Sequence, residues 1–94
     1  MDNKIIKRNE NIIFRKIEGM YVLLPMSSSG EDTEYIFNLN EIGSIIWEKI
    51  DGVKTFDEIV SELLKEFNGQ PDVIRQQAKE FINEIKEAKL IEVL

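Results

Sequence analysis

The pattern of apolar residues changes at Asn40, and this change constrains the fold of the 94-residue chain more than any other feature. Before Asn40, short apolar runs predict three strands, at residues 11–17, 20–25 and 35–39. After it, apolar residues recur at helical spacing and predict three helices, at residues 41–51, 56–68 and 71–89. This order predicts an α+β fold, in which a three-stranded antiparallel sheet is followed by a three-helix bundle that resembles a winged helix-turn-helix.

Residues that favour helix starts stand at the expected boundaries. Asn40 can cap the first helix, and Thr55 can form a capping box with Glu58 at the start of the second. Pro71 can open the third helix, at the position where helices tolerate proline best. We expect large apolar residues of the first two helices to lie in the core: Ile46, Trp47 and Leu63.

The length allows one domain, residues 1–94. Residues 1–10 are polar, and we expect them to be flexible. The N-terminal region contains no apolar segment long enough for a signal peptide, and no run approaches the ~20 apolar residues of a membrane span. We therefore expect a cytoplasmic protein that does not enter a membrane.

The chain contains no cysteine and no histidine, which excludes several kinds of chemistry. Disulfides, thiolate nucleophiles, Cys/His zinc sites and imidazole acid–base catalysis all need one of these residues. The Ser-Ser-Ser-Gly stretch at residues 27–30 has no histidine base, and the neighbouring Glu31 and Asp32 do not match a calcium-loop spacing. We expect no catalytic residues, no metal and no cofactor, and hence no enzyme.

The predicted third strand, residues 35–39, carries no charge, lysine or proline. Its alternation divides two faces, with Tyr35, Phe37 and Leu39 on one and Ile36 and Asn38 on the other. In a simple meander, this strand and the first strand would be the two edge strands. The first strand carries Arg15 and Lys16, whose charges discourage pairing with another strand. An unguarded edge is either covered by the protein's own loop or helix, or open to a partner strand.

The predicted third helix has its cations on one side of its apolar stripe. The expected stripe is Ile74, Ala78, Phe81, Ile85 and Ala88. The flank beside it holds Arg75, Lys79, Ile82, Lys86 and Lys89, whereas the acids lie on the opposite flank and back: Asp72, Glu80, Glu84 and Glu87. One interpretation is an ordinary amphipathic helix with segregated charges. The other is a cationic, partly apolar strip that receives an acidic partner.

From the third strand through the second helix, the sequence resembles the PqqD-like family, also called RiPP recognition elements. The residues that carry the resemblance are Leu39-Asn40, Gly43, Ile46-Trp47, Asp51-Gly52, Thr55, Ile59 and Leu63, with the tail Ala-Lys-Leu-Ile-Glu-Val-Leu at residues 88–94. The likeness spans about residues 11–92. One departure is Ile42, where the family usually has Thr or Ser before the glycine. Another is the long polar loop before the third strand.

The resemblance implies a non-catalytic module that captures the leader segment of a ribosomally made precursor peptide. In the family, the leader adds as an antiparallel strand to the third strand and lies against the third helix. The partner enzyme is commonly a radical SAM enzyme, a cyclodehydratase or a leader peptidase, and no residue here selects pyrroloquinoline quinone synthesis. Because the chain begins with Met and has the size of one domain, we expect a free-standing protein, monomeric or weakly dimeric.

Combining the resemblance with the bare strand and the one-sided helix predicts a binding site. Its residues are Tyr35, Ile36, Phe37, Asn38, Leu39, Arg75, Lys79, Ile82 and Lys86. We expect the leader to carry acidic residues near a bulky apolar anchor that meets Ile82. Two alternatives are a winged-helix nucleic-acid-binding regulator and a structural subunit that dimerises through the bare strand. The formal net charge of −6 weighs against nucleic acid as a partner.

Overall fold

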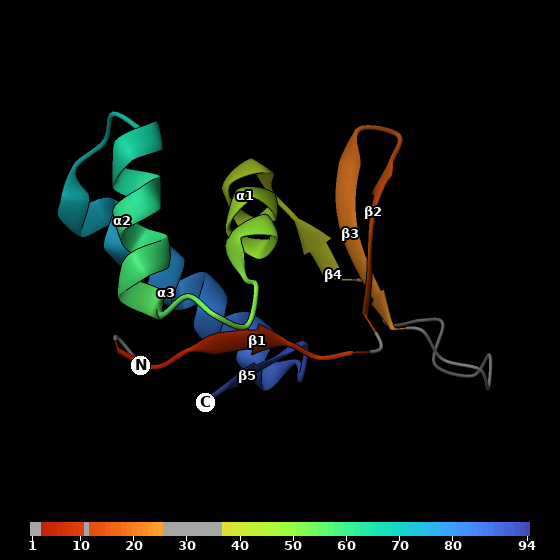
Figure 1. Cartoon of the computed structure of the whole chain (residues 1–94). Helices are drawn as coiled ribbons and strands as arrows, with labels where there is room; N and C mark the ends of the chain where they lie inside the picture. Colours follow the sequence, from red (N-terminus) through yellow and green to blue (C-terminus); the bar gives the residue numbers. More distant parts are fainter. Residues whose placement is uncertain (1–2, 11, 26–36) are drawn as a thin grey trace.

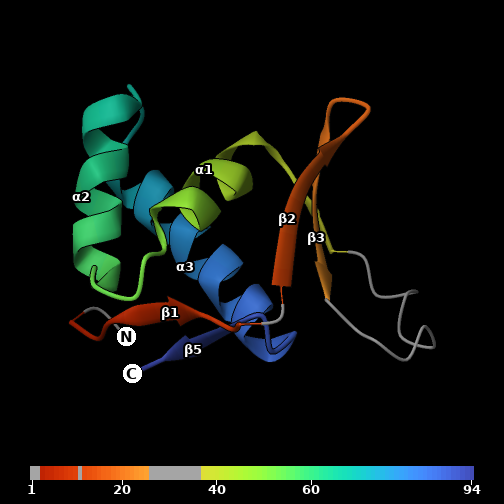
Figure 2. The same ribbon diagram turned by 45° about the vertical axis from the view of Figure 1, so that its right-hand side comes forward.

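The computed structural model of the protein describes residues 3–10, 12–25 and 37–94. Its elements, in chain order, are β1 (Ile6–Arg8), β2 (Ile12–Ile17), β3 (Met20–Pro25), β4 (Phe37–Leu39), α1 (Glu41–Lys49), α2 (Phe56–Glu66), α3 (Pro71–Glu87) and β5 (Ile91–Val93). Figures 1 and 2 show α1 between the β2–β3–β4 sheet and α2, with the β1–β5 pair at one end of the molecule. The predicted α+β class is confirmed.

The larger sheet is the predicted antiparallel meander, with strand order β2-β3-β4. Glu18 and Gly19 form the hairpin turn with φ values of 51° and 83°, a conformation that matches the right-handed twist of the flanking strands. β3 pairs with β4 so that Leu23 lies opposite Phe37 and Tyr21 opposite Leu39. β4 is therefore an edge strand, as predicted, although residues 35 and 36 lie outside the described part of the chain.

The helices begin where the capping residues predicted. The side chain of Asn40 accepts a hydrogen bond from the backbone N–H of Gly43 at 2.7 Å. Thr55 and Glu58 form the reciprocal capping box at the start of α2, and Pro71 is the first residue of α3. Among the residues that the structure describes, no helix is both long enough and apolar enough to cross a membrane.

The core lies between the larger sheet and the three helices. As predicted, Ile46 and Leu63 are fully buried and Trp47 is only 1% exposed. The inner face of the sheet contributes Leu23 and Leu39 to the same cluster. Burying each such side chain stabilises the fold by roughly 1.5–3 kcal/mol, so these few residues carry much of the stability of so small a domain.

The expectation that residues 1–10 are flexible is wrong for β1. Ile6 is fully buried, and β1 forms a two-stranded antiparallel sheet with β5. On its other side, the backbone of Ile6 donates to the carbonyl of Lys54 and accepts from Gly52 N–H. The Arg8 guanidinium donates to the carbonyl of Trp47 at 2.6 Å and lies 5.0 Å from the centre of its ring. Sequence patterning missed this strand because its partners are distant in the chain and most of its neighbours are charged.

Candidate functional site

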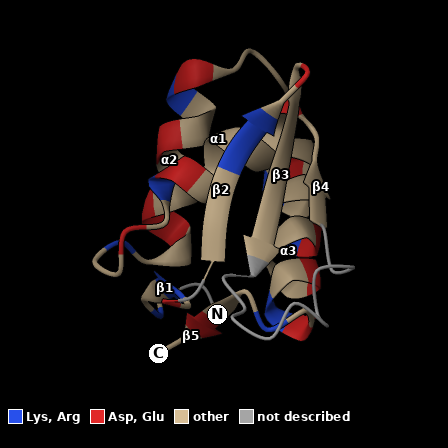
Figure 3. Ribbon diagram, turned by 90° about the vertical axis from the view of Figure 1, so that its right-hand side faces the viewer, with Lys and Arg blue, Asp and Glu red and all other residues tan. Residues whose placement is uncertain are grey.

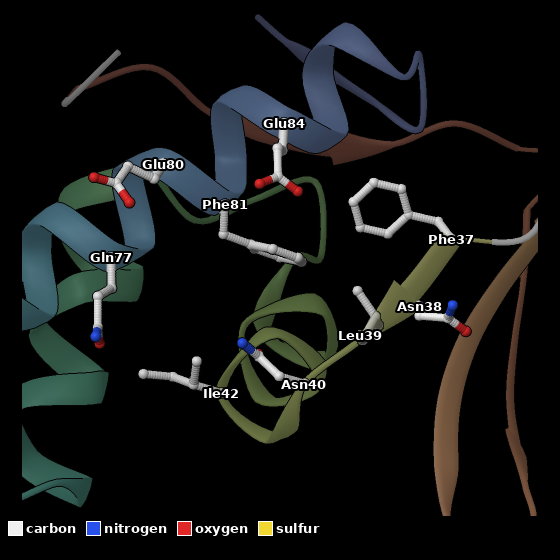
Figure 4. A pocket seen from close by; sticks show the side chains of 9 residues that line it. All are labelled: Phe37, Asn38, Leu39, Asn40, Ile42, Gln77, Glu80, Phe81 and Glu84. Atoms are coloured by element: carbon white, nitrogen blue, oxygen red, sulfur yellow. The ribbon is translucent and has the colours of Figure 1, made fainter.

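A groove of about 310 Å³ lies between the edge strand β4 and helix α3, with the start of α1 at its floor (Figure 4). β4 and the beginning of α1 supply one side of the lining: Phe37, Asn38, Leu39, Asn40 and Ile42. Successive turns of α3 supply the other side: Gln77, Glu80, Phe81 and Glu84. β4, the start of α1 and α3 thus form one open groove along the edge of the strand.

β4 offers both main-chain and side-chain groups to this groove. No described strand pairs with its outer edge, so alternate residues direct their N–H and C=O groups away from β3. Phe37 is half-buried and Leu39 is buried against the core, whereas Asn38 is exposed on the other face of the sheet. The strand can therefore accept another extended chain along its edge, beside an apolar surface.

The α3 wall combines one aromatic ring with acidic side chains. Phe81 is half-buried and points toward β4, and the ring of Phe37 lies across the groove from it (Figure 4). Glu80 and Glu84 are exposed and one helical turn apart, and they are the charged residues of the lining. Gln76 donates to the Glu80 carboxylate at 3.0 Å, and no described cation forms an ion pair with either glutamate. The wall is therefore apolar at its base and negative at its rim.

Gly43 in α1 makes room for the Phe81 ring. A Cβ atom at this position would lie 3.1 Å from Cε1 of Phe81 and 3.0 Å from Oδ1 of Asn40, closer than side chains normally approach. The absence of a side chain lets the ring rest on α1 beside the capping residue. Gly43 thus leaves room for a ring of the groove wall without lining the groove itself.

The predicted site residues divide into two groups. Phe37, Asn38 and Leu39 line the groove, and Tyr35 and Ile36 lie outside the described residues. On α3, none of the predicted strip lines the groove: Arg75, Lys79, Ile82 and Lys86. Ile82 is fully buried in the core, so the expectation that it forms an exposed apolar contact is wrong.

The rest of the predicted strip faces elsewhere. Arg75 donates to Asp57 of α2 at 2.8 Å and lies over the ring of Phe56, whereas Lys79 and Lys86 are exposed to solvent. Arg75 instead lines a hollow between α2 and the beginning of α3. The cationic flank of α3 therefore does not form a wall of the groove, contrary to the prediction from the sequence.

The error arises from two adjacent apolar residues. Phe81 and Ile82 can each complete a helical stripe that starts at Ile74 and Ala78, but they differ by about 100° around the helix axis. The structure buries Ile82 and leaves Phe81 at the margin, which turns the acidic flank toward β4. Sequence reasoning therefore missed the α3 residues of the groove: Gln77, Glu80, Phe81 and Glu84. The sequence did contain a signal, since Phe81 and Ile82 are adjacent and either of them could take the core position.

Two solved structures resemble the whole fold. The structure of TbiB1 in complex with the TbiA(beta) leader peptide matches with a TM-score of 0.73 and 23% identity, over 92% of this chain and 94% of that chain. The structure of lasso peptide synthetase B1 complexed with the leader peptide matches with a TM-score of 0.72 and 16% identity, over 93% of this chain and 96% of that chain. At these identities the likeness establishes the fold.

Sequence comparison gives the family directly. No curated protein sequence matches the chain. The family model described as coenzyme PQQ synthesis protein D matches residues 21–91, which include β4, all three helices and every residue of the groove. The chain belongs to the PqqD family.

Proposed function

We propose that this protein binds the leader segment of a ribosomally synthesised precursor peptide and presents it to a modifying enzyme. The observation that carries the proposal is the open edge of β4, which forms one wall of a groove whose other wall is α3. Family membership supports it, as do two structures of the same fold, TbiB1 and lasso peptide synthetase B1, which are complexes with leader peptides.

In the proposed mode of binding, the leader adds to β4 as a further antiparallel strand. Main-chain hydrogen bonds to the strand edge supply affinity that does not depend on leader sequence. Side chains that alternate toward α3 supply selectivity, and a bulky apolar residue can fill the space between Phe37 and Phe81. Holding the leader in this way raises the effective concentration of the attached substrate region at the enzyme.

We infer a non-catalytic role because the chain has no histidine or cysteine, and because the groove offers an extended binding surface. Within the described residues, no three side chains of the metal-binding types gather into a group that could hold an ion. A radical SAM enzyme, a cyclodehydratase or a leader peptidase would then perform the modification. The winged-helix description of the bundle and the cytoplasmic location stay predictions from the sequence.

The alternative, nucleic-acid binding, is not favoured by the geometry. Phosphate contacts need clustered cations, whereas the net charge is −6 and the charged residues of the groove are glutamates. The exposed Arg15 and Lys16 lie on β2, at the opposite edge of the sheet (Figure 3).

The test is a titration of the isotope-labelled protein with the leader of a precursor encoded beside its gene. We expect the largest chemical-shift changes at residues 37–39 of β4 and at Gln77, Glu80, Phe81 and Glu84 of α3. A scan of leader peptides, each N-methylated at one residue, should weaken binding at alternate positions, because only alternate residues bond the edge strand. If β4 and α3 do not respond, or if the N-methyl scan lacks this alternation, strand addition is wrong.

A further inference from the structure

The acidic side chains of the groove differ from those elsewhere on the helices in whether a cation pairs with them. On α2, Glu62 accepts hydrogen bonds from Lys54 and Lys49, which lower the pKa of its carboxyl group. Glu66 also accepts from Lys49, and Asp57 accepts from Arg75. The two glutamates of the groove have no such cationic partner among the described residues. Their charge is therefore available to a ligand.

The nearest sequence neighbours do not neutralise this charge either. Lys79 and Lys86 lie on the opposite side of α3 from Glu80 and Glu84, because residues one or two positions apart do not share a helix face. Figure 3 shows acidic segments of α3 beside β4. A ligand strand on β4 thus passes a wall that carries two negative charges.

The spacing of the wall matches an extended peptide. Glu80 and Glu84 are four residues apart on a helix, a rise of about 6 Å. Side chains on one face of a strand repeat every two residues, at about 6.5–7 Å. The ring of Phe81 lies below the glutamates and faces Phe37 (Figure 4). Phe81 stands between Glu80 and Glu84 in the sequence, so an apolar side chain beside its ring leaves a same-face neighbour, two positions away, on the side of one or the other glutamate.

We propose that the groove selects leaders in which Lys or Arg stands two positions from a bulky apolar anchor, on the face turned toward α3. The anchor occupies the space between Phe37 and Phe81, and the cation meets Glu80 or Glu84. Acidic leaders are disfavoured by repulsion from the same pair. This inference rests on the proposed function, and it replaces the acidic leader that the sequence predicted.

The experiment compares two short labelled peptides that differ only in charge. Both carry one central Phe; one has Lys two residues before and after it, and the other has Glu at these positions. We expect the Lys peptide to bind about three- to tenfold more tightly at low salt, since partly exposed ion pairs are individually weak. The preference should shrink as salt screens the charges.

Matched variants locate the effect on one flank of α3. The double substitution Glu80→Gln and Glu84→Gln should remove the preference, and both side chains are exposed, so the thermal unfolding midpoint should change little. The control, Lys79→Gln with Lys86→Gln, changes as many charges on the opposite flank. It should keep the preference for the Lys peptide.

The outcomes separate this inference from the proposed function. If both peptides shift the resonances of β4 and α3 equally, or if the Glu peptide binds more tightly, the charge selection is wrong while leader binding stands. If neither peptide perturbs the groove, the selection is also wrong, and the titration with the encoded leader decides the function separately. Persistence of the preference in the double glutamine variant also overturns the inference.

Discussion

The two flanks of α3 carry opposite charges and meet different surroundings. The flank with Glu80 and Glu84 faces the edge of β4 across a groove. The flank with Lys79 and Lys86 is exposed, and Arg75 at its beginning is paired to α2. Segregated charge on a helix therefore does not identify the flank that faces a binding site. The position of the buried stripe decides it, because a shift of one residue turns the other flank toward the sheet.

The largest expected effect tests the buried stripe itself. Ile82→Ala should lower the free energy of unfolding by about 2–5 kcal/mol, because Ile82 is fully buried and its truncation leaves a cavity. Urea denaturation measures the loss, and Ile82→Val should lose only about 0.5–1.5 kcal/mol. A variant that stays fully stable but no longer binds leader would show that Ile82 contacts the ligand. The cationic flank of α3 would then be the flank that faces the binding site.

The next effect tests the groove flank. Phe81→Ala should weaken leader binding about tenfold or more, as truncation of a central aromatic anchor does, while the protein stays folded. Isothermal titration calorimetry at a temperature well below unfolding measures this change. The matched control is Phe67→Ala, another half-buried phenylalanine that packs against the core but lies outside the groove. Equal losses of affinity in both variants would mean that Phe81 acts only through stability.

The sequence predicted the fold where local signals agreed with the global arrangement. Asn40, Thr55 and Pro71 placed the helix starts, because capping depends on residues next to one another. The edge position of β4 followed from a simple meander. Two features could not be predicted in this way. The pairing of β1 with β5 joins the chain ends, and the orientation of α3 depends on whether Phe81 or Ile82 packs better against the other elements.

A smaller effect tests how the groove flank is positioned. Gly43→Ala should gain up to about 1 kcal/mol of helix propensity. Its new methyl group would meet the Phe81 ring at 3.1 Å, and overpacking of this kind costs about 1–3 kcal/mol. We therefore expect a net loss of stability of at most about 3 kcal/mol and a displaced Phe81 ring, seen in its aromatic resonances. In the double variant with Phe81→Leu, the crowding should be partly relieved, and a mutant cycle measures this coupling. Additive effects would show that Gly43 and Phe81 do not constrain each other.

The smallest effect tests the cationic flank. Arg75→Met removes the charge but keeps an unbranched side chain near Phe56, so it isolates the ion pair with Asp57. The paired side chains are 42% and 48% exposed, and such pairs contribute about 0.2–1 kcal/mol or less. We expect a small loss of stability in urea that disappears in high salt, since salt screens exposed charges. Leader affinity should stay within about twofold of the original, or about 0.4 kcal/mol, because Arg75 does not line the groove. A loss of affinity comparable to that of Phe81→Ala would place the ligand on the cationic flank, and the acidic wall beside β4 would then have another role.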